Sequence, residues 1–355
     1  MRLKELLSLA VQGGPGVIQL ALTNVCNAHC RFCSFPDTPP AARMMADFHH
    51  LCQGLALLPR AGIHYVVLTG GEPLLYPELP DVLKKARAAG LTTLLCTNGA
   101  LLTTTLIQEL KEAGLNTLII SLDAASPQEH DEHRGLPGLT GHLQELLPEI
   151  NAAGLKPVAS VTLSRLIPDL AAMAHFAHRL GFRRLTFSYP LTRLQSSYRG
   201  CADHPSVTFT PQELDTLLGR IRALKAAAPL TILNPRASLQ DLQRQLRRQR
   251  PRFPCLAGFK YFYVDWHLMV YPCHYLPQIL TPLTELHRFR PRRNGCAACI
   301  IDCYRDPSVY QYVAVSLAEA LNYLRHRQWR RGLQTLLHPY NFLSLVSLWE
   351  GRHWL

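Results

Sequence analysis

One phrase recurs five times in the first 190 residues of the chain: a helix-like segment ends in glycine, and a short apolar strand follows. The five copies are RAGIHYVVLTG (60–70), AAGLTTLLCTN (88–98), EAGLNTLIISLD (112–123), AAGLKPVASVTLS (152–164) and RLGFRRLTFSYP (179–190). Glycine suits the left-handed residue that closes a helix, and nearly continuous apolar strands are typical of a parallel sheet covered on both faces. With a first strand in GVIQLALT (16–23), the pattern predicts an α/β fold, a partial (β/α)6 barrel of the TIM type.

The residues that directly follow each strand are the first candidates for function, because active sites of such sheets form at the C-terminal ends of the strands. These positions hold cysteines, glycines and polar residues: Cys26, Cys30 and Cys33, then Gly70 to Pro73, Thr97 to Gly99, Ser121 and Asp123, Thr162 and Ser164, and Ser188 to Pro190. Strand ends are often polar because they exit to water, but that reason does not explain the cysteines.

Cysteine is unusually frequent, with eleven residues in 355. The start, MRLKELLSLAVQGG, is interrupted by Glu5 and predicts a short amphipathic helix rather than a signal peptide. The chain contains no run of about 18 apolar residues, so no membrane span is predicted. We therefore expect a cytoplasmic protein that can associate with a membrane. In a reducing compartment, clustered cysteines indicate metal binding or catalysis.

The first cysteine group has the spacing C-x3-C-x2-C in CNAHCRFC (26–33). Cys26, Cys30 and Cys33 can fill three iron corners of a [4Fe–4S] cluster and leave one iron open for an added ligand. Zinc is the alternative, but zinc motifs usually add a second cysteine pair or a histidine at a set spacing, and His29 lies inside the loop.

Residues 16–190 resemble the radical S-adenosylmethionine (SAM) enzyme superfamily. The resemblance depends on CNAHCRFC, on LTGGEP (68–73), on TNG (97–99) and on SLDAASPQEHDEHRG (121–135), each after its own predicted strand. It implies that SAM chelates the open iron through its amino and carboxylate groups. One electron from the cluster then cleaves SAM, and the 5′-deoxyadenosyl radical attacks the substrate. It also implies a low-potential electron donor such as flavodoxin or ferredoxin.

The resemblance assigns SAM contacts to motif residues. Phe32 is expected near the adenine, Glu72 or the adjacent backbone at the SAM ammonium, and Arg134 at the SAM carboxylate as a bidentate donor. Gly70 and Gly71 are expected to let the backbone approach the ligand closely. The remaining expected contacts are Pro73, Thr97, Asn98, Ser121, Asp123 and Ser164. Many relatives carry an asparagine after the fifth strand, where this chain has Ser164 and Arg165.

The second cysteine group lies at 255–303. CLAGFKYFYVDWHLMVYPC (255–273) predicts a hairpin around DWHL, and CAACIIDC (296–303) follows. This order is similar to the auxiliary-cluster extensions of radical SAM enzymes, the SPASM and twitch domains. It implies one auxiliary [4Fe–4S] cluster on Cys255, Cys273, Cys296 and Cys299, with Cys303 as a replacement for one of them. A zinc-ribbon-like knot is the alternative.

The chain therefore divides into an N-terminal helix (1–15), a barrel (16–250), a SPASM/twitch-like module (251–305) and a helical tail (306–355). The tail mixes arginines with Trp329, Tyr340, Phe342, Trp349 and Trp354. Such a helix either lies in a membrane interface or packs on its own barrel. The net charge of +12 fits a solvated basic face or an acidic partner, and nucleic acid is the least favoured partner because no aromatic-interleaved motif accompanies the charge.

Three functions remain open. The first is a radical SAM enzyme acting on a lipid or other small molecule, since the order of parts also looks loosely similar to the adenosyl hopene transferase branch. The second is a maturase of a ribosomal peptide, and the third is a non-catalytic iron–sulfur electron carrier. Tyr189, Arg193 and Cys201 are further candidates for the substrate side, whereas Cys52 and Cys96 are expected to be inert core residues.

Overall fold

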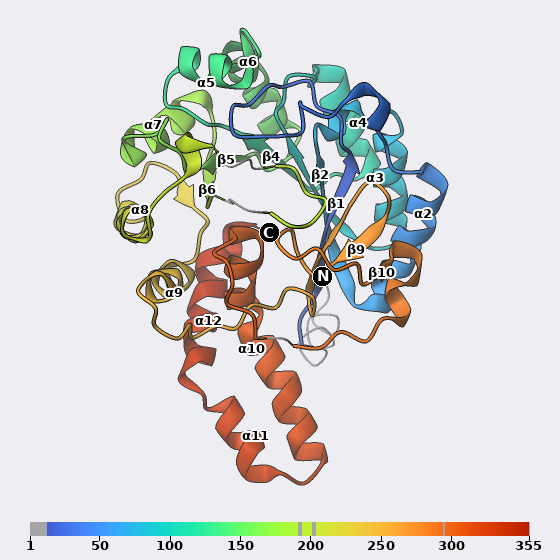
Figure 1. Cartoon of the computed structure of the whole chain (residues 1–355), viewed down its shortest axis with the longest axis vertical. Coiled ribbons are helices and arrows are strands. Elements are labelled where there is room, and N and C mark those ends of the chain that lie inside the picture. The colour runs from blue at the N-terminus through green and yellow to red at the C-terminus, as the bar shows by residue number, and fades with distance from the viewer. Residues whose placement is uncertain (1–12, 191–193, 201–203, 294, 355) are drawn as a thin grey trace.

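The computed structural model describes residues 13–190, 194–200, 204–293 and 295–354 (Figure 1). In the described part, ten strands form one sheet with the order β10-β9-β8-β1-β2-β3-β4-β5-β6-β7. Neighbouring strands pair in parallel from β8 through β1 and on to β7. Strand β9 pairs antiparallel with both β8 and β10. The strands are β1 (Gly16–Thr23), β2 (Ile63–Gly70), β3 (Thr92–Thr97), β4 (Thr117–Ser121), β5 (Val158–Thr162), β6 (Arg184–Ser188), β7 (Thr231–Ile232), β8 (Tyr261–Val264), β9 (Met269–Tyr271) and β10 (Thr281–Pro282).

Helices alternate with the first six strands and lie outside the sheet in Figure 1. They are α2 (Phe48–Leu57), α3 (Leu79–Ala88), α4 (Thr104–Ala113), α5 (Pro127–Arg134), α6 (Leu139–Ala152) and α7 (Leu170–Leu180). Two more follow, α8 (Pro211–Leu224) and α9 (Arg236–Leu246), before the tail helices α10 (Asp302–Arg325), α11 (Trp329–Leu336) and α12 (Pro339–Glu350). The six predicted strands are all present as β1 to β6, so the predicted partial barrel is confirmed.

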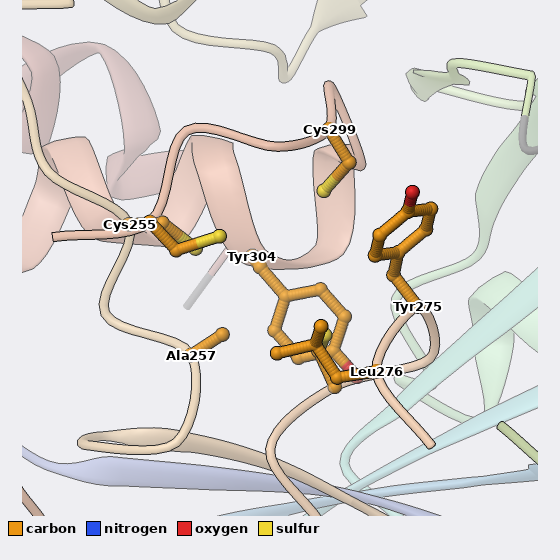
Figure 2. Close-up of a pocket in the computed structure, with 8 residues that line it drawn as sticks. Cys255, Ala257, Tyr275, Leu276, Cys299 and Tyr304 are labelled. Carbon is orange, nitrogen blue, oxygen red and sulfur yellow. The ribbon is translucent and has the colours of Figure 1, made fainter. Parts of the chain in front are cut away.

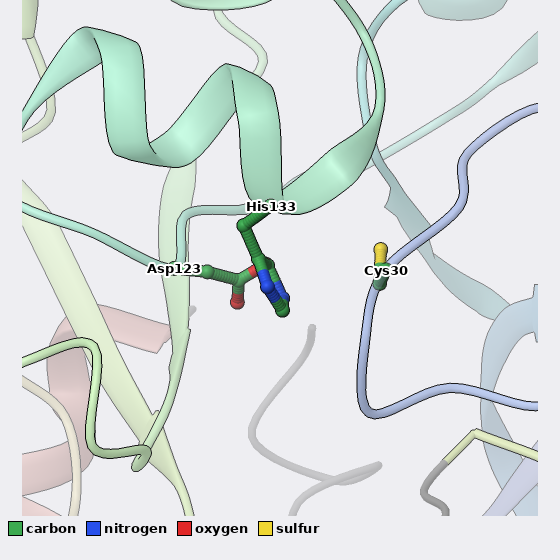
Figure 3. Close-up of side chains that lie close together, drawn as sticks. All are labelled: Cys30, Asp123 and His133. Atoms are coloured by element: carbon green, nitrogen blue, oxygen red, sulfur yellow. The ribbon is translucent and has the colours of Figure 1, made fainter. Parts of the chain in front are cut away.

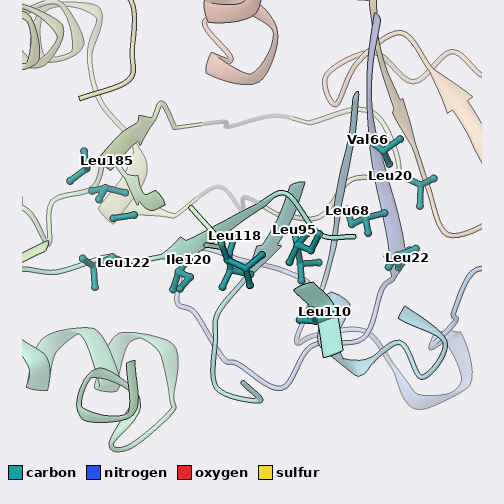
Figure 4. Close-up of a cluster of buried hydrophobic side chains, with 14 of the residues drawn as sticks. Leu20, Leu22, Val66, Leu68, Leu95, Leu110, Leu118, Ile120, Leu122 and Leu185 are labelled. Atoms are coloured by element: carbon teal, nitrogen blue, oxygen red, sulfur yellow. The ribbon is translucent and has the colours of Figure 1, made fainter. Parts of the chain in front are cut away.

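The main core lies between the strands and these outer helices. Alternate strand residues such as Leu20, Leu95 and Leu118 are fully buried there, together with Leu110 of α4 (Figure 4). The residues between them point to the inner face of the sheet, where Ile119, Val158 and Leu233 form a separate small cluster. The inner face is therefore the side of the barrel that the outer helices do not cover.

The cysteine-rich segment is part of the same sheet. The predicted hairpin forms as β8 and β9, and β8 pairs in parallel with β1, with Val17 opposite Tyr261. The two-residue strand β7 extends the opposite edge beyond β6. Neither attachment follows from local sequence, because both pair segments that are far apart along the chain.

The C-terminal tail is helical, as predicted. Helix α10 already begins at Asp302, inside the segment assigned to the cysteine module. A capping box between Thr210 and Glu213 marks the start of α8. Most of the expected N-terminal helix (1–15) lies outside the described residues. None of the helices described here is long and apolar enough to cross a membrane.

Candidate functional site

The loop after β1 carries Cys26, Cys30 and Cys33 at the C-terminal end of the sheet. All three are half-buried. The loop is tight: the amide of Cys33 donates to the carbonyl of Cys30 over 3.0 Å, and the amide of Ala28 donates to the Cys26 sulfur over 3.4 Å. The spacing therefore does bring three thiols to one short loop at the predicted edge.

Two asparagines that the sequence analysis missed hold this loop in place. The buried Asn24 side chain donates to the carbonyl of Ala42 over 2.8 Å and accepts from the amide of Met44 over 2.7 Å. Asn27 accepts a 2.8 Å hydrogen bond from the side chain of Asn98, at the end of β3. The only sequence signal for them is their position just after a predicted strand.

Gly70 and Gly71 are required by a close approach between two segments of backbone. Gly70 has φ +127°, and a Cβ there would overlap the carbonyl oxygen of Thr23. A Cβ on Gly71 would overlap the carbonyl oxygen of Val25. These glycines let the end of β2 pack on the cysteine loop, and their expected approach to a ligand stays a prediction. The buried Pro73 then begins a short 3-10 turn.

Glu72 ties the ends of β2 and β3 together. Its buried carboxylate accepts from the Thr97 hydroxyl (2.7 Å), the Asn98 amide (2.8 Å) and the Leu74 amide (3.0 Å). Burial raises the pKa of Glu72, and these three donors oppose that shift. The carboxylate therefore already has three donors, and whether Glu72 or the adjacent backbone meets the SAM ammonium stays a prediction.

Asp123 and Arg134 form a buried ion pair beside the cysteine loop. Arg134 Nη2 lies 2.6 Å from Asp123 Oδ2, and His133 Nε2 lies 3.6 Å from the same oxygen. The ligand atoms of Cys30, Asp123 and His133 all lie within 4.8 Å of one another (Figure 3). The amide of His29 also donates to the Arg134 carbonyl over 2.7 Å, so the end of α5 is fixed to the loop. Arg134 is therefore buried against the thiols rather than on the surface.

Burial keeps the thiols of Cys26 and Cys30 neutral when no metal is bound. Burial raises the pKa of Cys26 to about 11 and also raises that of Cys30, while the Arg134 cation opposes both shifts. Thiols that are neutral on their own become thiolates when they bind a metal. Three thiols from one loop, with a buried cation next to them, fit an anionic iron–sulfur cluster on this loop.

Three other expected contacts are placed at the same end of the sheet. Phe32 is buried, with its ring 4.6 Å from that of His133. Ser121 is half-buried at the end of β4. Ser164 is buried, and its hydroxyl accepts from the amide of Leu166 over 3.3 Å, which closes a local turn. Their roles toward SAM stay predictions.

Four of the five late cysteines line one cavity. They are Cys255 before β8, Cys273 after β9, and Cys296 and Cys299 before α10 (Figure 2). The rest of the lining is Ala257, Tyr275, Leu276 and Tyr304. Four thiols converging from three segments on a mostly apolar cavity fit a fully ligated [4Fe–4S] cluster, and by donor type alone they also suit zinc.

Cys303 is not part of that cavity lining. Its thiol instead lies 3.7 Å from Asp302 Oδ2, and Cys96 of β3 is close enough to affect its pKa. Asp302 accepts from the Ser188 hydroxyl over 3.3 Å and from the amide of Tyr189 over 3.4 Å. Polar groups of α10, β3 and β6 thus meet at the inner face of the barrel, a group that the sequence analysis missed.

Burial raises the pKa of Asp302 from its ordinary 3.8 to about 6, with hydrogen bonds from Tyr189 and Ser188 opposing the shift. Its contribution to stability is therefore full below pH 3.8 and is lost as pH rises through about 6. We expect Asp302→Asn to become more stabilising, relative to wild type, by about 1 kcal/mol between pH 5 and pH 7.5. Urea unfolding of both proteins at each pH measures this difference. A difference that stays constant or shrinks with pH contradicts the ionisation assigned to Asp302.

The other candidates for the substrate side, and the two cysteines expected in the core, lie in different environments. Tyr189 is fully buried, and its hydroxyl accepts from Asn234 over 3.1 Å, so its ring is a core element. Arg193 and Cys201 lie outside the described residues. Cys52 and Cys96 are half-buried, and Cys96 faces the inner side of the sheet rather than the outer core.

Comparison with known proteins agrees with this geometry. Residues 20–169 match the family model described as the radical SAM superfamily. The chain is 25% identical over 295 residues to the AdoMet-dependent heme synthase of Methanosarcina barkeri, covering 78% of this chain and 82% of that protein. It is also 25% identical over 272 residues to the PqqA peptide cyclase of Xanthomonas axonopodis pv. citri (75% and 70% covered). For the GTP 3′,8-cyclase of a Synechococcus strain, 39% identity extends over 148 residues, which is 40% of this chain and 42% of the cyclase.

Solved structures share the fold. Streptococcus suis SuiB bound to the precursor peptide SuiA superposes with a TM-score of 0.55 at 15% identity, covering 86% of this chain and 68% of SuiB. Native anSMEcpe with bound AdoMet, which is SAM, gives 0.58 at 14% identity, covering 87% and 99%. The matched segment 20–169 contains the three-cysteine loop and the motifs that follow β2, β3 and β4. Residues 20–169 of the chain therefore match the radical SAM superfamily, and the protein is an enzyme whose cofactors are a [4Fe–4S] cluster and SAM.

Proposed function

We propose that Cys26, Cys30 and Cys33 hold the [4Fe–4S] cluster and leave one iron open for SAM. When bound, the cluster supplies the electron that cleaves SAM into methionine and a 5′-deoxyadenosyl radical. The observation that carries this proposal is the set of three half-buried thiols on one loop, with the ends of β2, β3 and β4 beside it.

The surrounding residues keep the loop and the ligand in register. The backbone at Gly70 and Gly71 fixes the loop against β2, and it is our candidate partner for the SAM amino group. Arg134 balances the negative charge of the thiolates and orients Asp123, its ion-pair partner. Phe32 and His133 exclude water from this side, since both side chains are buried and their rings are in contact.

We propose that residues 251–305 form an auxiliary module in which Cys255, Cys273, Cys296 and Cys299 hold a second [4Fe–4S] cluster. The convergence of these thiols on one cavity supports it. Radical SAM enzymes need a reductant, and a low-potential donor such as flavodoxin or ferredoxin fits that need. Because the chain is an enzyme, a purely electron-carrying role is not proposed.

The substrate we favour is a lipid or another small molecule. It would lie on the inner face of the barrel, next to the ends of the strands, where Asp302 and Cys303 offer polar groups. The relative with the broadest coverage among those compared is named a heme synthase, and heme is a small molecule. This supports a small-molecule substrate without identifying it.

A ribosomal peptide is the second candidate. It is favoured by the PqqA peptide cyclase, which this chain matches over 70% of the cyclase's length. The peptide-bound SuiB structure shows that a fold of this kind accommodates a peptide in that protein.

The test of the radical chemistry uses anaerobically reconstituted full-length protein, SAM and dithionite. We expect the electron paramagnetic resonance spectrum of the reduced protein to change when SAM is added, and 5′-deoxyadenosine to accumulate in mass-spectrometric assays. An unchanged spectrum together with no 5′-deoxyadenosine would overturn the proposed cluster site.

The substrate class is tested with cell material grown in deuterated medium and separated into a solvent-extracted lipid fraction, a water-soluble metabolite fraction and a peptide fraction. Transfer of deuterium to 5′-deoxyadenosine, or an adenosyl adduct made from isotope-labelled SAM, should appear with the lipid or metabolite fraction. Either signal with the peptide fraction alone would replace our first candidate by the second.

A further inference from the structure

Helix α12 is packed with its polar side inward. Its buried residues are Asn341, Ser344 and Ser347, and the Ser344 hydroxyl donates to the carbonyl of Val309 in α10 over 2.7 Å. Its apolar side chains point outward: Phe342 is 69% exposed and Trp349 is 66% exposed. A helix on the surface of a water-soluble domain normally shows the opposite arrangement, so the outer face of α12 needs an apolar partner.

Helix α11 is arranged in the same way. The residue that it buries is Gly332, where a Cβ would meet the side chain of Leu324 in α10. Trp329, Leu333 and Leu337 follow at intervals of four residues and are all exposed, Leu337 by 80%. Figure 1 shows α11 at one end of the long axis of the molecule, away from the sheet.

The charges around these two helices are almost all positive. Residues 325–349 contain no aspartate or glutamate, while Arg325, Arg327, Arg330 and Arg331 are all exposed. The next acidic residue, Glu350, is paired with Arg236 at 3.4 Å. The apolar stripes are therefore bordered by arginines, and residues 325–349 contain no carboxylate that could balance their positive charge.

We propose that the outward faces of α11 and α12 form a docking surface for a bilayer that contains anionic phospholipids. Apolar stripes with tryptophans, bordered by arginines, are the features that bind the interface between headgroups and acyl chains. Neither helix is long and apolar enough to cross a bilayer, so both would lie along its surface. We refer to the six side chains Trp329, Leu333, Leu337, Phe342, Leu345 and Trp349, with the bordering arginines, as the tail surface.

A bilayer fits this surface better than a second copy of the chain does. In a symmetric dimer the same face meets itself, and the exposed arginines of one copy would then approach those of the other without carboxylates between them. Anionic headgroups instead supply the missing negative charge, at about 1 kcal/mol for each arginine near the membrane. This inference depends on the tail alone and not on the proposed function of the barrel.

The test is flotation of the reconstituted full-length protein with vesicles made of equal parts phosphatidylcholine and phosphatidylglycerol. We expect the wild type to float with these vesicles and much less with phosphatidylcholine alone. The triple variant Leu337→Ser/Phe342→Ser/Trp349→Ser should bind at least about tenfold more weakly. The double variant Arg330→Gln/Arg331→Gln should also bind these vesicles at least about tenfold more weakly than the wild type.

The matched control is Ile279→Ser, because Ile279 is 54% exposed but lies before β10, outside the tail. It should float like the wild type, and circular dichroism and iron content verify that every variant is folded. Three results would each overturn the proposal: a wild type that does not float with anionic vesicles, a triple variant that floats as well as the wild type, or a wild-type dimer that the triple variant converts to a monomer.

Discussion

Replacement of Cys30 by alanine is expected to abolish 5′-deoxyadenosine formation and to remove about four irons per chain from the reconstituted protein. Cys30 is the thiol nearest to Asp123 and His133, beside the Arg134 cation. Without it, the loop keeps two thiols, too few to hold the cluster and leave one iron for SAM. Iron analysis and mass spectrometry of the anaerobic reaction measure the two effects.

Cys52→Ala is the matched control, since Cys52 is also a free and half-buried cysteine but lies in α2, away from the loop. It should keep both the iron and the activity. If Cys30→Ala still produced 5′-deoxyadenosine, the loop would not be the site of SAM cleavage. A wild type that contains about one zinc at this loop and no iron would instead favour a mononuclear site made by Cys30, Asp123 and His133.

The barrel was predictable because its signals are local. Each of the first six strands follows a glycine-ended helix or the start of the chain, and each is rich in apolar residues. The pairing of β8 with β1 and of β7 with β6 has no such signal, because the partners are far apart in sequence and each pairing involves only a few residues. The sequence therefore predicts the barrel but not the two edges of its sheet.

The candidate site was partly predictable for the same reason. Its motif residues follow predicted strands, so their convergence at one end of the sheet could be expected. What each residue contacts could not be predicted: Glu72 accepts from three donors, and a Cβ on Gly70 would overlap the carbonyl oxygen of Thr23. Such contacts depend on the distance between two backbone segments, which spacing along one segment does not determine.

In the second cysteine group, the position where α10 begins determines which cysteines line the cavity. Spacing alone left Cys303 as a replacement for one of the four ligands. In the structure α10 begins at Asp302, so Cys303 lies in the first helical turn and its thiol approaches Asp302, while Cys299 precedes the helix and lines the cavity. The exact position of a helix start is among the least certain features of any sequence-based prediction.

This difference between two neighbouring cysteines leads to a second large expected effect. Cys299→Ala should lower the iron content of the reconstituted protein from about eight to about four irons per chain, because it removes one thiol of the auxiliary set. Cys303→Ala should keep about eight, since its thiol is not part of the cavity lining. Iron and sulfide analysis, with Mössbauer spectra of both variants, distinguishes the loss of a cluster from its partial occupancy.

Both variants should still cleave SAM without substrate, because Cys26, Cys30 and Cys33 are unchanged and lie on a different loop. That activity therefore serves as the control for folding of the barrel. The opposite pattern, with iron lost in Cys303→Ala and kept in Cys299→Ala, would move the auxiliary cluster toward Asp302 and the inner face. A protein that carries one zinc in place of the second cluster would show that the four thiols form a zinc knot, because zinc also accepts a closed set of four thiolates.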